Sequence, residues 1–232
     1  MSTSDALRRM LEHLDAAGVP YLLTGSFAAS AHGFLRTTHD FDFVIDPDSD
    51  TLQSFLDRLS PDDYDVDAGA AKDALARRTM FNVIDQATQW KFDLIVSPRD
   101  DFALNQFDRR GRVVIAGNEV WVASAEDVVV SKLVWARQGS SERQLRDVGG
   151  VVAVQGEALD RAYVETWAKR LGVDDLWRTV LAGLPPVGGR PTSPAPSTTR
   201  PTPSRPRRTS GRRRGRRAAR PRDGGTSSSP AP

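Results

Sequence analysis

The chain has 232 residues, no cysteine and a formal net charge of +2, but that charge is divided unevenly along the sequence. From residue 185 onward there are 12 arginines, one acid and 11 of the 15 prolines, whereas residues 1–184 carry a net charge of about −9. The lack of cysteine excludes disulfides and thiolate metal sites, and no stretch approaches the roughly 20 apolar residues of a membrane span. We therefore expect a cytoplasmic protein with an acidic body and a basic tail.

The predicted elements begin with an amphipathic helix that is capped by Ser4 and ends at Gly18. A strand at 19–24 then leads through Gly25-Ser26 into a short helix at 27–32. The further helices are expected at 51–59, 70–78, 125–138, 141–155, 159–171 and 174–184. The further strands are expected at 40–45, 80–84 and 91–96, and at 112–115 and 119–122, which form a hairpin.

Strands dominate the first half of this pattern and helices the second, so the predicted class is α+β: a small mixed β-sheet with a helical C-terminal part. We expect residues 1–123 to form a core and residues 124–184 a helical part of the same domain. Residues 185–232 contain almost no large apolar side chain, so they cannot offset the entropy of ordering and are predicted to be a disordered tail.

The strand at 40–45 carries the strongest functional pattern, Asp40-Phe41-Asp42-Phe43. Alternation along a strand places both aspartates on one face and both phenylalanines on the other. Two neighbouring carboxylates repel one another unless a cation lies between them, and hard oxygen ligands suit Mg²⁺ bound together with substrate phosphates. For an isolated Asp-x-Asp, a strand with its polar face in water is the better explanation, so further residues must decide.

Gly25-Ser26 supplies a second feature, because a strand passes there through glycine into the start of a helix. Free backbone N–H groups favour an anion at such a turn, and glycine lets a phosphate approach closely. Strand-to-helix turns often contain both residues for backbone reasons alone. The spacing is what matters: thirteen residues separate Ser26 from Asp40, enough for a short helix and a return loop.

Asp93 is the third feature, in the alternating segment Lys91-Phe92-Asp93-Leu94-Ile95-Val96. If this strand pairs beside 40–45, Asp93 lies on the carboxylate side together with Lys91 and Ile95. A third carboxylate permits a site with two metal ions, in which one activates an attacking hydroxyl and the other holds a triphosphate. Otherwise Asp93 is a solvent-facing residue at a strand end.

Together these residues resemble the DNA polymerase beta-like nucleotidyltransferase superfamily, and are most similar to its minimal bacterial members grouped with the AbiEii toxins. The resemblance covers roughly residues 5–180 and implies a β-sheet of the nucleotidyltransferase type. It rests on three segments: Leu23-Thr24-Gly25-Ser26, Arg36-Thr37-Thr38-His39-Asp40-Phe41-Asp42-Phe43 and Phe92-Asp93-Leu94.

The resemblance implies a role for each matching position. Asp40 and Asp42 would bind both metal ions, and Asp93 would hold the catalytic ion and help to take the proton of the acceptor hydroxyl. Four residues would form the nucleotide-binding group. Gly25 and Ser26 would contact the β- and γ-phosphates, Thr38 would support the start of the strand, and Arg36 would contact phosphate or acceptor. A surface ion pair is an equally good explanation for Arg36.

The match continues less closely into the helical part, where Glu126-Asp127, Lys132 and Arg146-Asp147 look like the family's later positions. Lys132 would be a catalytic lysine that reaches the triphosphate, or else a residue on a solvated helix face. The chain then departs from the family at Val148-Gly149-Gly150, where further acids are common, and this puts toxin-like activity in doubt.

The expected activity is transfer of a nucleotidyl group from a nucleoside triphosphate (NTP) to a hydroxyl, with Mg²⁺ or Mn²⁺ as cofactor. Acceptor candidates are an RNA end, tRNA in particular, a protein side chain, or a small molecule such as an antibiotic. The acidic body argues against a large nucleic-acid footprint, whereas the arginine run 212–217 would bind phosphate backbones without sequence preference, unless the tail is an extension without a role. A non-catalytic nucleotide-binding partner in a toxin–antitoxin pair is the competing class, and a cognate antitoxin is a further expected partner.

Overall fold

The computed structural model describes residues 2–34 and 38–183, which fall within one compact unit spanning residues 1–189. The tail predicted at 185–232 and the candidate residue Arg36 lie outside the described residues. None of the helices in the described ranges combines the length and the apolar character needed to span a membrane.

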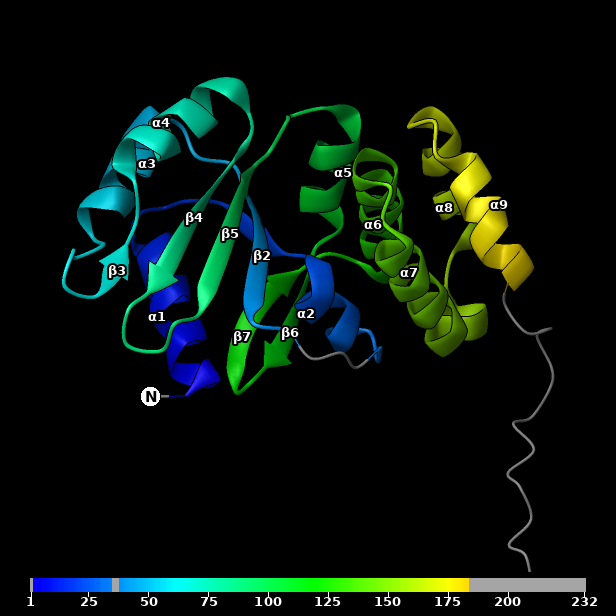
Figure 1. Ribbon diagram of the computed structural model, residues 1–232, viewed down its shortest axis with the longest axis horizontal. Coiled ribbons are helices and arrows are strands. Elements are labelled where there is room, and N and C mark those ends of the chain that lie inside the picture. Colours follow the sequence, from blue (N-terminus) through cyan, green and yellow to red (C-terminus); the bar gives the residue numbers. More distant parts are fainter. Residues whose placement is uncertain (1, 35–37, 184–232) are drawn as a thin grey trace, which may run out of the picture. The chain divides into compact units, whose positions relative to one another are not determined.

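A seven-stranded mixed sheet forms the centre of the fold, with the strand order β3-β4-β5-β2-β1-β7-β6 (Figure 1). The pairs β2–β5 and β1–β7 are parallel and the other four pairs are antiparallel. This confirms the α+β class, the mixed sheet and the helical C-terminal part. The strands are β1 (Tyr21–Leu23), β2 (Asp40–Ile45), β3 (Tyr64–Asp65), β4 (Met80–Asp85), β5 (Lys91–Val96), β6 (Gly111–Ile115) and β7 (Asn118–Val122).

The helices separate into two groups around this sheet. Figure 1 shows α3 and α4 beside the β3–β4 end of the sheet, whereas α6 to α9 gather at the opposite side of the view. The helices are α1 (Thr3–Ala16), α2 (Gly25–Ala31), α3 (Ser49–Asp57), α4 (Ala68–Arg77), α5 (Asp101–Arg109), α6 (Ala125–Gly139), α7 (Glu142–Gln155), α8 (Arg161–Arg170) and α9 (Asp174–Gly183), with a 3₁₀ turn at Gly156–Ala158.

The core begins with the aromatic residues that alternate with the aspartates. Phe41, Phe43 and Phe92 are fully buried. Phe41 stacks on Phe92 with ring centroids 5.3 Å apart, and on Phe27 of α2 at 4.1 Å. Because successive side chains of a strand point to opposite faces, burying these rings fixes which face of the sheet the aspartates occupy.

The predicted hairpin is present, with Ala116 and Gly117 as its two turn residues at φ 48° and 81°. Positive φ at both positions is the geometry of a type I′ turn, which matches the twist of two antiparallel strands. The turn is therefore one residue earlier than a Gly-Asn turn would be, because Asn118 belongs to β7 and its side chain bonds back to Ser4.

Several element boundaries differ from the prediction, and two elements were not predicted. Helix α1 is capped by Ser2, whose side chain accepts a hydrogen bond from the Asp5 backbone, so the cap expected at Ser4 is wrong. Helix α2 begins at Gly25 itself, not at residue 27. The two-residue strand β3 is too short to show an alternating pattern. Helix α5 carried a usable signal, because Asp100 caps it and accepts from the Ala103 backbone.

Candidate active site

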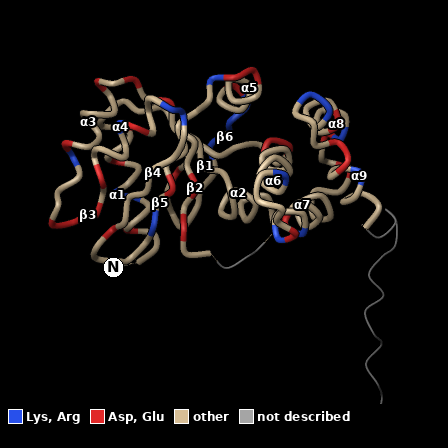
Figure 2. The backbone as a smooth tube through the Cα atoms, turned by 45° about the horizontal axis from the view of Figure 1, so that its top comes forward, with Lys and Arg blue, Asp and Glu red and all other residues tan. Residues whose placement is uncertain are grey.

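Asp40, Asp42 and Asp93 lie on one face of two neighbouring strands. In the parallel pair β2–β5, Asp42 is in register with Asp93, and Asp40 is in register with Lys91. The pairing that Asp93 required for its predicted role is therefore present. Figure 2 shows acidic positions of β2 and β5 close together in the middle of the fold.

Gly25 lets the start of α2 approach Asp42 directly. Its φ is +65°, and a Cβ atom at this position would lie 1.9 Å from Oδ2 of Asp42. Only glycine combines this backbone conformation with such a contact. The turn therefore places the helix start against the middle carboxylate, which is the juxtaposition that the spacing from Ser26 to Asp40 indicated.

The environment of Asp42 favours its neutral form. Burial, with Asp40 and Asp93 close by, raises the pKa of this carboxyl group to about 6. The charge of Lys132 and a hydrogen bond from the Ser26 backbone N–H act in the opposite direction on the same pKa. A backbone N–H group of the turn is thus directed at the Asp42 carboxyl group.

Asp93 is more deeply buried than a solvent-facing strand residue would be, with 7% of its surface exposed. Its Oδ2 lies 2.8 Å from the Nζ atom of Lys91. Its Oδ1 is buried and accepts no hydrogen bond from the described residues. A buried carboxylate oxygen without a donor is costly unless a cation completes its environment, so the donor set fits a hard divalent ion.

The remaining carboxylate, Asp40, accepts a hydrogen bond from the Thr38 hydroxyl at its Oδ1. Thr38 therefore supports the start of β2 by orienting a carboxylate. Among the described residues, no group of three or more acidic or histidine side chains is already arranged to hold a metal ion. Asp40 is turned toward Thr38 and Asp93 toward Lys91, so these two side chains would have to reorient around an ion.

Lys132 is buried, with 1% of its surface exposed, and does not lie on a solvated helix face. From α6 its ammonium group reaches across to α7, 2.9 Å from Oδ2 of Asp147 and 3.0 Å from Oε1 of Gln144. Breaking a buried ion pair leaves an uncompensated charge and is strongly destabilising. Lys132 thus joins two helices while its charge favours ionised Asp42.

Gly150 and Gly33 have a packing role. A Cβ atom at Gly150 of α7 would lie 2.1 Å from the ring of Phe34, and one at Gly33 would lie 2.6 Å from Val154. Residues 33 and 34 are therefore packed on α7, and residue 150 must be small to admit the ring.

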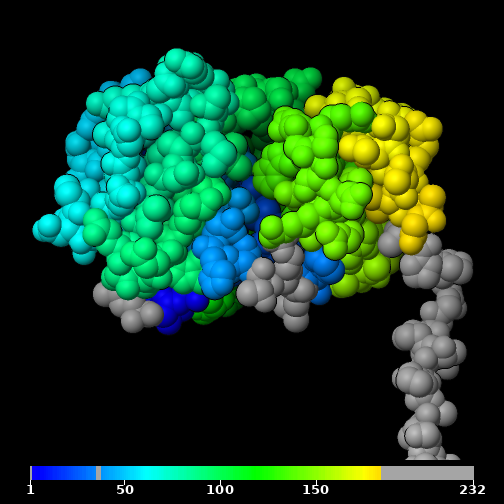
Figure 3. Space-filling model, in the orientation of Figure 1, coloured from blue at the N-terminus to red at the C-terminus, as the bar shows by residue number. Residues whose placement is uncertain are grey.

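A cavity of about 380 Å³ adjoins two of the carboxylates, Asp42 and Asp93. Its other walls come from β4 and β5 on one side and from α6 and α7 on the other. Figure 3 shows a crevice between these two surfaces, where the teal part of the chain faces the yellow-green helices. Besides the two aspartates, the lining residues are Thr79, Met80, Ile95, Trp135, Gln138 and Gln144.

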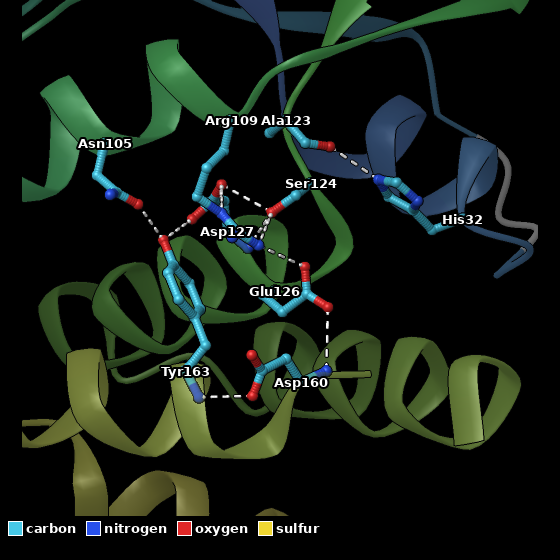
Figure 4. A network of polar contacts seen from close by, with 9 residues as sticks. All are labelled: His32, Asn105, Arg109, Ala123, Ser124, Glu126, Asp127, Asp160 and Tyr163. Atoms are coloured by element: carbon cyan, nitrogen blue, oxygen red, sulfur yellow. Dashed lines mark hydrogen bonds and ion pairs between the residues drawn. The ribbon is translucent and has the colours of Figure 1, made fainter. Parts of the chain in front are cut away.

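A second polar cluster, shown in Figure 4, holds the C-terminal helices together. Asp127 is fully buried, accepts a 2.7 Å hydrogen bond from the Ser124 hydroxyl and pairs with Arg109 at 3.5 Å. The Tyr163 hydroxyl lies 2.5 Å from Asp127 Oδ1 and 2.6 Å from Asn105 Oδ1. Since this hydroxyl has one proton, it donates to the anionic Asp127, and the Asn105 amide must present its NH₂ group instead.

Replacing Tyr163 by phenylalanine is expected to destabilise the fold by about 1–3 kcal/mol, because it removes a donor from a buried carboxylate. Urea unfolding of wild type and Tyr163→Phe measures this difference. Tyr21→Phe is the matched control, because no hydrogen bond within the described residues involves the Tyr21 hydroxyl although the ring is buried. Equal losses in both variants would show that the Tyr163 hydroxyl does not support Asp127.

The structure thus brings together most of the predicted site. Asp40, Asp42 and Asp93 share a face, Gly25 and Ser26 adjoin Asp42, and Thr38 contacts Asp40. Asp127 belongs to the separate cluster of Figure 4. Two contributors were not predicted: Lys91 as an ion-pair partner of Asp93, and Trp135 as a cavity wall. The sequence did carry a signal for Lys91, because the alternation of strand 91–96 places it on the same face as Asp93.

No protein-family model matches the chain, and no curated protein matches it. Similar solved structures include the antibiotic-resistance factor ANT(2'')-Ia, with 13% identity and a TM-score of 0.45, covering 77% of this chain and 92% of the other. A nucleotidyltransferase-like protein from Paracoccidioides brasiliensis has 17% identity and a TM-score of 0.46, over 78% and 93%. The lincosamide antibiotic adenylyltransferase LnuA has 12% identity and a TM-score of 0.45, covering 66% of this chain and 98% of the other. With similarity this low, the functional argument rests on the site.

Proposed function

We propose that the protein transfers a nucleotidyl group from an NTP to a hydroxyl acceptor in a reaction that needs a divalent metal ion. The observation that carries the proposal is the register of Asp42 with Asp93, beside Asp40 and against the Gly25 turn. Three neighbouring carboxylates suit Mg²⁺ or Mn²⁺, and one of them, Asp93, has a buried oxygen without a hydrogen-bond donor among the described residues. The backbone N–H groups at the start of α2 suit the triphosphate.

In this proposal each residue has a chemical task. Asp40 and Asp42 would hold both metal ions and Asp93 the catalytic one. The ions would neutralise the triphosphate and polarise the attacked phosphorus. Gly25 and Ser26 receive the β- and γ-phosphates at the turn, and Arg36 contacts phosphate or acceptor. Asp93 takes the proton of the acceptor hydroxyl as its oxygen bonds to the α-phosphorus and the bond to pyrophosphate breaks. Thr38 orients Asp40, and Lys132 contributes a positive charge that favours ionised Asp42.

The acceptor is either a small molecule or an RNA end. The cavity beside Asp42 and Asp93 favours the first, because about 380 Å³ lies in the range of small-molecule sites and one wall is the aromatic ring of Trp135. The negative charge of residues 1–184 also disfavours a large RNA footprint. RNA, tRNA in particular, is the alternative acceptor if the arginine-rich tail supplies the positive charge that RNA binding needs. A toxin–antitoxin role depends on RNA being the acceptor.

Transfer of radiolabel from each α-labelled NTP tests the proposal, with Mg²⁺ or Mn²⁺ and either total RNA or a mixture of hydroxylated small molecules. We expect wild type to label one acceptor class and Asp93→Asn to label none. Equal labelling by both proteins would contradict a catalytic site at Asp93, and NTP binding without transfer would indicate a non-catalytic nucleotide-binding module. Labelling of RNA that survives removal of residues 185–232 would exclude the tail from the reaction.

A further inference from the structure

Lys91 stands out among the charged residues because its ammonium group lies within the carboxylate cluster. It is 2.8 Å from Asp93 Oδ2 and sits opposite Asp40 in the strand register. Asp93 above all, and Asp40 and Asp42 in addition, raise the pKa of the lysine by stabilising its charge. Lys91 is therefore the cation in direct contact with the cluster, whereas Lys132 acts on Asp42 only through its charge.

The other lysines with a described ion pair are placed differently. Lys169 pairs with Glu165 one turn away on the exposed surface of α8, and Lys132 is buried between two helices. Lys91 is intermediate: its side chain is 40% exposed, whereas that of its partner Asp93 is 10% exposed. A side chain with this much exposure can leave the cluster for water at little cost, which a buried lysine cannot do.

A divalent ion at this cluster would bind the carboxylate with which Lys91 is now paired. Asp93 offers Oδ1, which has no donor, and Oδ2, which is paired with the ammonium group. An ion bound by both Asp42 and Asp93 would place two positive charges within a few ångströms of a third, and like charges at that distance repel strongly where solvent is scarce. The ammonium and the metal ion therefore compete for the same carboxylate.

We propose that Lys91 is a built-in counter-cation of the Asp40–Asp42–Asp93 cluster, which a divalent metal ion displaces from Asp93 as it binds. Lys91 then has two effects. It neutralises the cluster when no metal is bound, and it sets the metal concentration that the site requires. This inference deepens the proposed function and rests on its metal site, but it concerns binding and not transfer.

Titration of full-length protein with Mn²⁺, followed by calorimetry, measures the competition directly. Lys91→Met keeps the length of the side chain but removes its charge, and we expect it to bind Mn²⁺ roughly tenfold more tightly than wild type. Lys91→Arg keeps the charge and should bind close to wild type. Lys72→Met is the matched control, because Lys72 is an exposed lysine of α4. Equal or weaker binding by Lys91→Met would overturn the proposal.

Amine labelling of the wild-type protein tests the same idea without a substitution that could impair folding. The chain has only four lysines, so mass spectrometry can follow each one. We expect Mn²⁺ to increase the labelling rate of Lys91 and to leave that of the surface residue Lys169 unchanged. An unchanged or slower rate at Lys91 would overturn the displacement.

The role of Lys91 and the metal site itself are tested by different results. If wild type binds Mn²⁺ and Asp42→Asn does not, but Lys91→Met binds no more tightly, only the role of Lys91 is wrong. If neither wild type nor Lys91→Met binds Mn²⁺ in a manner that depends on Asp42, the metal site and the proposed function both fail.

Discussion

Replacing Asp42 by asparagine is expected to lower nucleotidyl transfer by at least about 10³-fold and, at the same time, to stabilise the metal-free protein near neutral pH. Transfer falls because the amide cannot hold a cation between Asp40 and Asp93. Stability rises because the asparagine amide carries no charge, whereas ionised Asp42 is half-buried beside two other carboxylates. A residue with a merely structural role would lose stability and activity together.

The raised pKa of Asp42 predicts how the stability of the metal-free protein changes with pH. The pKa of Asp42 is about 6 in the fold and near 3.8 in the unfolded chain, so between these values the folded state binds the extra proton. Its contribution therefore makes metal-free wild type less stable as pH rises from about 4 to about 6, by up to about 3 kcal/mol. We expect Asp42→Asn to exceed wild type by that amount above pH 6 and to match it below pH 4.

Urea unfolding of both proteins from pH 4 to pH 7, in the presence of a chelator, measures this difference. Asp62→Asn is the matched control, because Asp62 is an exposed aspartate and its substitution should leave the pH profile unchanged. A constant difference between Asp42→Asn and wild type across the range would contradict the raised pKa. Retained transfer by Asp42→Asn would contradict the metal site.

Replacing Gly25 by alanine is expected to lower transfer as well, for a steric reason. The new methyl group would lie 1.9 Å from Oδ2 and 2.6 Å from Cγ of Asp42, so the carboxylate or the start of α2 must move. Positive φ adds a conformational cost of roughly 1–2 kcal/mol for any residue other than glycine. We expect a loss of about 10²-fold or more in transfer and weaker Mn²⁺ binding.

Gly18 provides the matched control for this experiment. Its φ is +68°, close to that of Gly25, but a Cβ atom there would meet nothing within 4 Å. Gly18→Ala therefore carries the same backbone cost without the collision, and should lose stability but keep its transfer rate and metal affinity. If both alanine variants lose stability equally and both keep transfer, the contact between Gly25 and Asp42 does not matter to the site.

Much of the fold was open to prediction because its signals are local. The alternation of Asp40 to Phe43 and of Lys91 to Val96 identified both strands and the faces that they present, and their pairing was confirmed. Helices α6 to α9 lie close to their predicted bounds. Helix α5 was not predicted although Asp100 caps it, because it is a short amphipathic segment that follows directly on the strand end at Pro98.

The contacts that complete the site could not be predicted, since they join segments far apart in the sequence. Strand alternation places Lys91 beside Asp93, but only the fold shows that its ammonium group reaches that carboxylate and leaves Oδ1 without a donor. Likewise, only the fold shows that the missing side chain of Gly150 admits the ring of Phe34, which lies 116 residues earlier in the chain. No local pattern contains such a pairing.

The central claim is that Asp40, Asp42 and Asp93 bind divalent metal and the triphosphate of an NTP. Crystals grown with Mn²⁺ and a non-hydrolysable NTP test it most directly, because the anomalous signal of manganese locates each ion. The expected result is at least one anomalous peak within coordination distance of Asp42, with the triphosphate at the Gly25–Ser26 turn and the Lys91 ammonium moved away from Asp93. Nucleotide bound elsewhere, or no manganese at these carboxylates, would contradict the claim.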